Sequence, residues 1–229
     1  MSNNRRRSRI ALSACRAMIP PFLLITSLIG PLSATPTIAA PREELVPVLS
    51  HVGEASLRGT VGYVHIAFDR RSDASGLTIR FSTAPGRFSR SAQASIEEAI
   101  RRTAHSLKLS TDSWTVVLTI PYSDITISGE HLSGMIGLSV AAMATGRTVD
   151  PGLLVTGRIT QEGQIGPVGS APLQIPAPGR ARLRRVVVSK DQPLVERDQS
   201  ARDLIQVTPV SSVTQAFQEL IGEPPKPLR

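Results

Sequence analysis

Three residues with chemically useful side chains lie close together near the middle of the chain, namely Glu130, His131 and Ser133. A serine becomes a nucleophile when a neighbouring base accepts its proton. His131 is the nearest candidate base, although residues i and i+2 do not share a helix face, so only a turn could join the pair. A serine hydrolase that uses Ser133, with His131 or another group as base, is therefore one hypothesis.

The same residues could in principle hold a metal ion, with His65 or His105 as a further ligand. However, adjacent residues rarely face one ion together, and the chain has no pair of histidines or cysteines at metal-site spacing. A lone histidine at a helix start more often caps the helix or donates a hydrogen bond. We expect no metal site and no cofactor.

Two helices and a set of strands would position these residues. Residues 132–145 are small and aliphatic and end before Gly146, which predicts a buried helix. Residues 91–107 have an apolar face at helical spacing and the pairs Glu97–Arg101 and Glu98–Arg102 on the other face. We interpret those pairs as a solvated surface without a function.

Strand patterns surround both helices, and a last helix follows a capping signal at Ser212 and Gln215. The first two predicted strands are expected to form a hairpin, and a turn at 84–86 follows the second of them. The order predicts an α/β fold with mixed sheets and packed helices. The predicted strands are residues 59–68, 77–81, 114–120, 153–159, 164–168, 185–189 and 204–210.

The N-terminus has the arginine-rich, apolar and small-residue order of a secretory signal, which we assign to residues 1–40. The protein is then exported, to the periplasm or the medium. A retained single-pass anchor is the alternative, and lipidation at Cys15 is a weaker one because the apolar run follows the cysteine. Residues 41–58 are expected to be an irregular lead-in and 223–229 a disordered tail.

The charge of the chain is mostly explained by this N-terminal segment. Residues 1–40 hold five arginines and no acid, so their removal lowers the formal net charge from +8 to +3. The best basic cluster lies at 180–185 and is typical of a solvated loop that enters a strand. Nucleic-acid binding normally shows a clustered basic stripe, so we expect no nucleic acid as partner.

A series of short motifs follows in a fixed order through the middle of the chain. The motifs are Ile-Pro-Tyr-Ser-Asp-Ile at 120–125, Ser-Gly-Glu-His-Leu-Ser-Gly at 128–134, Thr-Gly-Arg at 145–147, Thr-Gly-Arg-Ile-Thr at 156–160 and Gly-Gln-Ile-Gly-Pro-Val-Gly at 163–169. In this order and spacing they resemble the proteolytic domain of Lon proteases, most strongly from Pro121 to Gly169, and the likeness covers about 59–222.

The resemblance implies peptide-bond hydrolysis by a serine at a helix start with a lysine as its base. Without gaps, the nucleophile position of the family falls on His131 and its lysine position on Gln174, which cannot act as a base at neutral pH. Ser133 lies two residues beyond the nucleophile position. Gly129, Thr156 and Gly157 match the family residues that form the substrate groove.

Two further departures accompany the missing lysine. Pro172, Pro176 and Pro178 lie where the family has its lysine-bearing helix, and an interior proline disrupts a helix by about 3 kcal/mol. The chain also has no Gly-x-x-x-x-Gly-Lys-Ser/Thr loop, and an exported protein would meet no ATP.

From these departures we expect a non-catalytic Lon-like module that works without ATP. It would bind a peptide or protein partner in the former substrate groove or assemble with copies of itself. A membrane would be involved only if the N-terminal segment is retained. The alternative is an active serine endopeptidase in which Ser133 is a displaced nucleophile.

Overall fold

A computed structural model describes residues 42–50, 60–169, 183–194 and 205–222, all of which belong to one compact unit that extends from Thr37. The proposed signal at 1–40, half of the lead-in, Gln174, the three prolines and the tail lie outside the described residues. No helix in the described part of the chain is long and apolar enough to cross a membrane.

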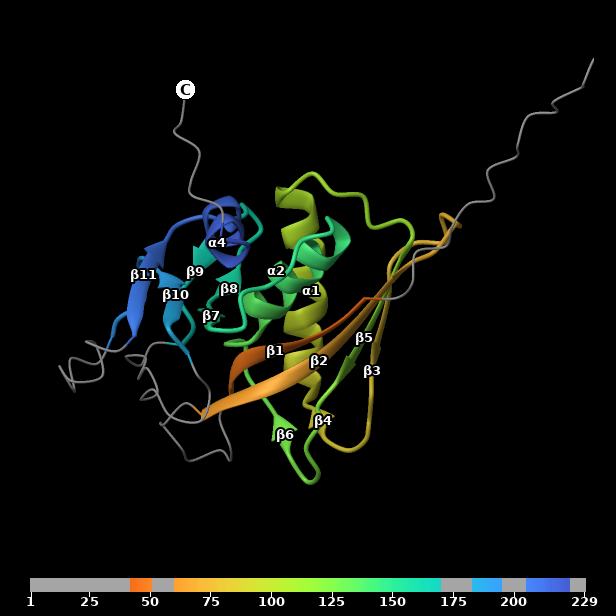
Figure 1. Ribbon diagram of the computed structural model, residues 1–229, viewed down its shortest axis with the longest axis horizontal. Coiled ribbons are helices and arrows are strands. Elements are labelled where there is room, and N and C mark those ends of the chain that lie inside the picture. The colour runs from red at the N-terminus through yellow and green to blue at the C-terminus, as the bar shows by residue number, and fades with distance from the viewer. Residues whose placement is uncertain (1–41, 51–59, 170–182, 195–204, 223–229) are drawn as a thin grey trace, which may run out of the picture. The chain divides into compact units, whose positions relative to one another are not determined.

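A four-stranded sheet forms one half of the domain (Figure 1). Its order is β1 (Arg42–Ser50), β2 (Thr60–Arg70), β5 (Trp114–Thr119) and β3 (Thr78–Phe81). β2 pairs antiparallel with β1 and β5, whereas β3 runs parallel to β5. Side chains on β2 and β5 alternate between buried and half-buried, as expected when a sheet covers a core on one face only.

Two expectations about this sheet are wrong. The segment expected to be an irregular lead-in is strand β1, whose Val46 and Val48 are buried. Pro47 and the exposed Leu45 hide the alternation, and proline is tolerated because β1 is an edge strand. β2 and β3 do not form a hairpin, because β5 lies between them.

Two helices cover the inner face of the sheet. α1 (Arg90–Ser106) begins at Ser89, whose Oγ accepts a hydrogen bond from the Ala92 N–H at 3.2 Å. α2 (Ser133–Ala144) is buried from its first residue to Met143, which explains its lack of a polar face. The helices touch at Gly137, where a Cβ would lie 2.9 Å from the Ala99 carbonyl oxygen.

The C-terminal half contains a parallel three-stranded sheet in the order β11 (Gln206–Val210), β10 (Arg185–Ser189) and β7 (Leu153–Thr156). α4 (Val213–Leu220) begins at Ser212, whose Oγ accepts from the Gln215 N–H at 3.2 Å, as the capping signal predicts. Two short pairs complete the structure, β4 (Arg87–Phe88) with β6 (Thr126–Ile127) and β8 (Arg158–Ile159) with β9 (Ile165–Gly166).

β10 joins the two apolar clusters of the domain. Val187 belongs to the main cluster, which holds the inner face of the large sheet and the helices. Val186 and Val188 belong to a second cluster together with Leu49 of β1. A strand that is buried on both faces has a continuous run of apolar residues, and β10 has three consecutive valines at 186–188. The predicted mixed α/β fold with packed helices is confirmed.

Candidate active site

Ser133 is the first residue of α2, and its hydroxyl is held inside the turn that leads to the helix. Its Oγ donates a hydrogen bond to the Glu130 carbonyl oxygen at 2.7 Å, and its N–H donates to the same oxygen at 3.1 Å. The residue is only 1% exposed. In this arrangement the hydroxyl proton points at a peptide carbonyl, which is not a general base.

The start of α2 is fixed against the strand that carries the Thr-Gly motif. The Gly134 N–H donates to the Gly157 carbonyl oxygen at 3.1 Å, and a Cβ on Gly134 would lie 2.5 Å from that oxygen. Gly157 has φ 154°, and a Cβ there would meet the Ile165 Cγ2 at 2.6 Å. The predicted strand 153–159 therefore breaks at Gly157 into β7 and β8, which lets the two motifs meet.

Thr156, immediately before this break, is 1% exposed. Its Oγ1 is buried and has no hydrogen-bond partner within the described ranges. An unpartnered buried hydroxyl costs about 1–3 kcal/mol. An apolar side chain of the same shape at position 156, beside the Gly134–Gly157 contact, would therefore make the domain more stable.

A small open pocket of about 50 Å³ lies beside the Ser133 turn. Two acidic and two basic side chains contribute to its lining, together with Ser133 itself. Arg102 Nη1 donates to the Ile159 carbonyl oxygen at 2.6 Å, and Arg102 is also ion-paired with Glu98. The complete lining is Ser95, Glu98, Arg102, Glu130, Ser133, Arg158 and Ile159.

His131 does not line this pocket, although it is only two residues from Ser133. It is half-buried in the turn before α2, and the Ser133 hydroxyl donates to Glu130 and not to this imidazole. Gly129 has φ 93°, and a Cβ there would lie 3.2 Å from the His131 Cδ2. The turn thus folds the ring back toward Gly129 and does not present it as a base to Ser133.

Glu130 and His131, with His65 or His105, were the candidate metal ligands. In the part of the chain that the structure describes, no three His, Cys, Asp or Glu residues are grouped so that they could hold an ion.

Residues 88–223, more than half of the chain, match the Lon protease (S16) C-terminal proteolytic domain. The chain belongs to this family. A stretch of 96 residues is 29% identical to a Lon protease of Methanosarcina barkeri; it covers 39% of this chain and 12% of that protein. The chain therefore corresponds to a small part of that relative.

Three of the four charged residues that line the pocket of this Lon-type domain, Glu98, Arg102 and Arg158, were not predicted to be site residues. Glu98 and Arg102 form the expected i,i+4 pair, but Arg102 also reaches a carbonyl 57 residues away in β8. A helical pattern shows which residues share a face but not which later segment packs beside that face. Arg158, the central residue of the Thr-Gly-Arg-Ile-Thr motif, was the available signal.

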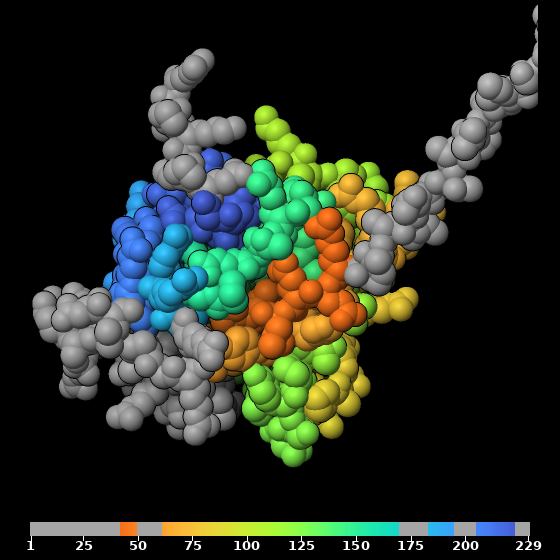
Figure 2. Space-filling model, viewed as in Figure 1, coloured from red at the N-terminus to blue at the C-terminus, as the bar shows by residue number. Residues whose placement is uncertain are grey.

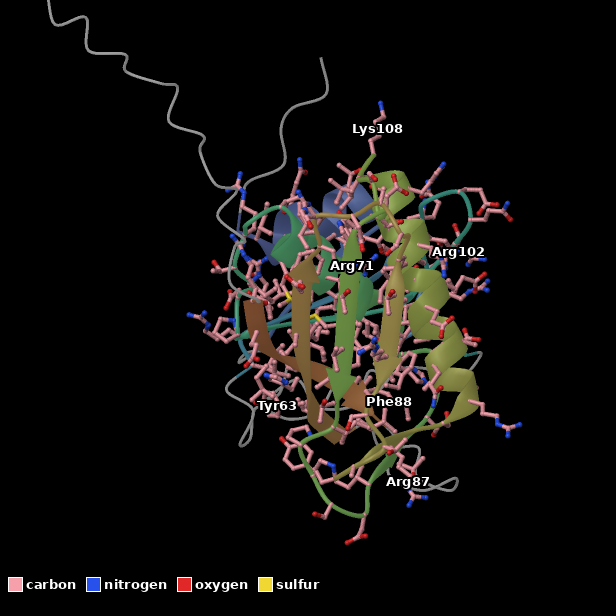
Figure 3. The ribbon with its side chains drawn as sticks, turned by 90° about the vertical axis from the view of Figure 1, so that its right-hand side faces the viewer. Tyr63, Arg71, Arg87, Phe88, Arg102 and Lys108 are labelled. Atoms are coloured by element: carbon pink, nitrogen blue, oxygen red, sulfur yellow. The ribbon has the colours of Figure 1, made fainter. Side chains whose placement is uncertain are left out.

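No lysine, the residue that serves as general base in Lon-type hydrolysis, is among the pocket-lining residues. Lys108 and Lys190 are the lysines in the described ranges, and neither lines the pocket. Lys108 follows the C-terminal end of α1 and extends away from the domain in Figure 3. Arg102 and Arg158 carry guanidinium groups, which donate hydrogen bonds and have no acceptor for the serine proton.

Proposed function

We propose that this Lon-type domain binds a polypeptide without cleaving it. The hydrogen bond from the Ser133 Oγ to the Glu130 carbonyl oxygen is the main support, because it holds the serine hydroxyl at the start of α2 against an oxygen that is not a general base. The sequence adds that His131 occupies the nucleophile position of the family and Gln174 its lysine position.

The pocket offers no simple substitute for the lysine. Glu98 is ion-paired with Arg102, so its carboxylate is already engaged by a guanidinium. The Glu130 side chain is exposed to water, and the main-chain carbonyl oxygen of Glu130 accepts the hydrogen bond from the Ser133 hydroxyl. Ser133 would therefore have to leave its buried position before it could attack a peptide bond.

Binding is a function that the same geometry supports. The pocket carries both signs of charge, from Glu98 and Glu130 and from Arg102 and Arg158, so it suits polar groups of a peptide. Its volume of about 50 Å³ admits a small polar group, because a single water molecule needs about 10–15 Å³ by the same measure.

We propose further that the protein is exported and works without ATP. The order of charged, apolar and small residues in 1–40 supports export, with a single-pass anchor as the alternative. N-terminal sequencing of the protein that cells accumulate would test it. A new N-terminus near residue 41 is expected, whereas an intact Met1 on membrane-bound protein would favour the anchor.

The binding proposal is tested with unfolded casein and short fluorescent peptides derived from it. We expect the anisotropy of a peptide to rise on titration with the protein while its length, followed by mass spectrometry, stays unchanged. Arg158→Glu should weaken binding about ten-fold. Arg101→Glu, an exposed change on α1 outside the pocket lining, should not. Equal binding by all three proteins would refute the role of the pocket.

An active serine endopeptidase is the second candidate, because Ser133 is at the first position of α2 and lines an open pocket with two carboxylates. That hypothesis predicts cleavage of casein by the purified protein and its loss in Ser133→Ala. Cleavage that persists unchanged in the variant would assign the activity to a contaminant or to another residue.

A further inference from the structure

Among the described residues, no helix covers β2 and β5 on the outer face of the four-stranded sheet, which is the side away from α1 and α2 (Figure 3). On β2 the inward Val64 and Ile66 are fully buried, whereas the outward His65 and Ala67 between and beside them are half-buried. Leu45 of β1, one of two exposed large apolar side chains in the described ranges, is 53% exposed on this face.

One row of side chains crosses the outer face from edge to edge. Glu43 of β1 is paired with Ala67 of β2, Ala67 with Val117 of β5, and Val117 with Arg80 of β3. Directly paired residues point to the same side of a sheet. Glu43 and Arg80, at the two ends of the row, are exposed. The row is therefore acidic at one edge, apolar in the middle and basic at the other edge.

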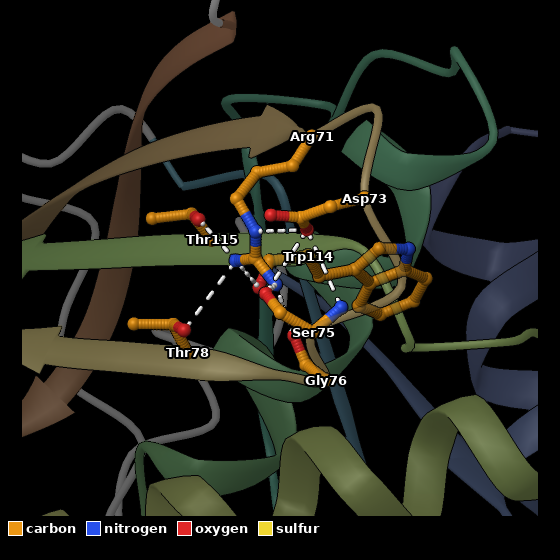
Figure 4. A network of polar contacts seen from close by, with 7 residues as sticks. All are labelled: Arg71, Asp73, Ser75, Gly76, Thr78, Trp114 and Thr115. Carbon is orange, nitrogen blue, oxygen red and sulfur yellow. Dashed lines mark hydrogen bonds and ion pairs between the residues drawn. The ribbon is translucent and has the colours of Figure 1, made fainter.

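The end of the outer face next to this row is held in a fixed shape by Arg71 (Figure 4). Its Nη1 donates to the Thr115 Oγ1 at 2.6 Å and to the Trp114 carbonyl oxygen at 2.9 Å. The same guanidinium is ion-paired with Asp73 at 2.9 Å. Glu43 Oε2 lies 3.4 Å from His65 Nε2 on the same face, but the Glu43 side chain is still 62% exposed. Because Arg71 is engaged inside the domain, Glu43 and the exposed Arg80 are the complementary charges at the two ends of the row.

We propose that the outer face is the interface of a symmetric dimer with a second copy of this chain. A two-fold axis that runs parallel to the strands between β2 and β5 keeps each row at its level and reverses its direction. Glu43 then faces Arg80 of the second copy, and Ala67 faces Val117, each contact occurring twice. This proposal goes beyond peptide binding and does not depend on the loss of catalysis.

The charges select this orientation. Stacked sheets lie about 10 Å apart, a gap that a glutamate and an arginine extended toward each other can span. An in-plane axis perpendicular to the strands would place β1 over β1 and β3 over β3, so that Glu43 and Arg80 would not face each other. The edge strand β1 is at the surface of the view in Figure 2, and its outward residues Glu43 and Leu45 are exposed.

The dimension of the face predicts a weak dimer. Four strands spaced about 4.8 Å apart and six residues long give a patch of roughly 400 Å² in projection. Stable interfaces bury about 800 Å² of accessible surface on each partner. We therefore expect a dissociation constant in the micromolar range and a dimer that weakens as salt is added.

Charge exchange tests the proposal by sedimentation equilibrium of the protein in the form that expressing cells accumulate. Wild type should dimerise between about 1 and 200 µM. Glu43→Arg and Arg80→Glu should each weaken the dimer at least about ten-fold, because each places like charges opposite one another. The double exchange should return the dissociation constant to within about three-fold of wild type.

Arg101→Glu on α1 is the control, since it changes charge by the same amount outside the outer face. Circular dichroism melts establish that each variant is folded, and Glu43→Gln with Arg80→Gln replaces any exchange variant that is not. A wild type that stays monomeric, for instance because other residues of the chain cover the face, would overturn the proposal. So would a double exchange no tighter than either single change.

Discussion

At the scale of single residues, the Ser133 turn combines a buried hydroxyl with a carbonyl acceptor. The hydroxyl and the N–H of Ser133 both donate to the Glu130 oxygen, so the turn satisfies two donors with one acceptor. Thr156, across the Gly134–Gly157 contact, has a buried hydroxyl without a described partner. The same region thus holds one satisfied and one unsatisfied hydroxyl.

Thr156→Val is expected to stabilise the domain. Valine has nearly the same shape, and its methyl group would replace the unpartnered Oγ1, so the free energy of unfolding should rise by about 1 kcal/mol. Denaturant melts of wild type and variant measure the change. Ser133→Ala, which removes a satisfied hydroxyl, is the matched control and should lower the same quantity. A loss of stability in Thr156→Val would mean that this hydroxyl has a partner.

Glu44 makes the stability depend on pH. Its pKa is raised from the usual 4.5, mainly by burial, although the Val149 backbone and Arg42 act in the opposite direction. Because the pKa of Glu44 is higher in the folded protein than in the unfolded chain, Glu44 stabilises the folded state below about pH 4.5, where its carboxyl is protonated in both. That contribution is lost as the pH rises through the pKa of the folded state.

The variant Glu44→Gln isolates this effect because it cannot ionise. We expect the variant to be more stable than wild type at pH 7, and the difference to shrink as the pH falls toward 4.5. Thermal melts across that range measure it. Glu43→Gln, on the exposed side of the same strand, is the control and should show a smaller change. A variant less stable at neutral pH would contradict the account.

At the scale of elements, close contacts between glycines and backbone decide how the helices meet the sheet. Gly137 brings α2 against α1, because a Cβ would lie 2.8 Å from the Thr103 Oγ1 and 2.9 Å from the Ala99 carbonyl oxygen. Gly134 brings the helix start against Gly157. These contacts hold the Ser133 turn beside the Thr-Gly motif.

Gly137→Ala should therefore reverse the usual effect of this substitution in a helix. Alanine normally stabilises a helix interior by about 1 kcal/mol relative to glycine. Here the added methyl group should overpack the helix contact and lower the free energy of unfolding by about 1–3 kcal/mol. Urea titration would measure it, and a variant more stable than wild type would show that the helices can move apart at no cost.

Arg71 holds the loop after β2 to the start of β5. It donates to Thr115 and to the Trp114 carbonyl oxygen, and pairs with Asp73. Arg71→Lys keeps the charge but removes the fork of donors, so we expect a loss of about 1–3 kcal/mol in the free energy of unfolding. Arg87→Lys, an exposed arginine on β4, should leave it nearly unchanged. Equal changes would refute the role of the network.

The elements could be predicted from sequence where one period dominates, as in α1, α2 and β5. β1 could not, because Pro47 and the outward Leu45 interrupt its pattern and its burial comes from contacts with distant segments. The predicted hairpin was wrong for a related reason. β5 lies between β2 and β3 in the sheet, and no local sequence pattern indicates that a strand from a later part of the chain pairs with both. Ser133 could be located from sequence, but the acceptor of its hydroxyl could not.

At the scale of the whole molecule, the chain has the helices and sheets of a Lon-type proteolytic domain. Our proposal is that this domain binds a polypeptide without cleaving it. The outer face and the pocket involve different elements, so binding and dimerisation can be tested independently.

Labelling of Ser133 by a fluorophosphonate probe tests the central claim most directly. A hydroxyl activated for peptide hydrolysis reacts covalently with such a probe, and peptide mass spectrometry identifies the modified residue. We predict no labelling of Ser133 in the folded wild type, as in Ser133→Ala, while an active serine protease in the same tube is labelled fully. Stoichiometric labelling of Ser133 that is absent from the variant would contradict the account.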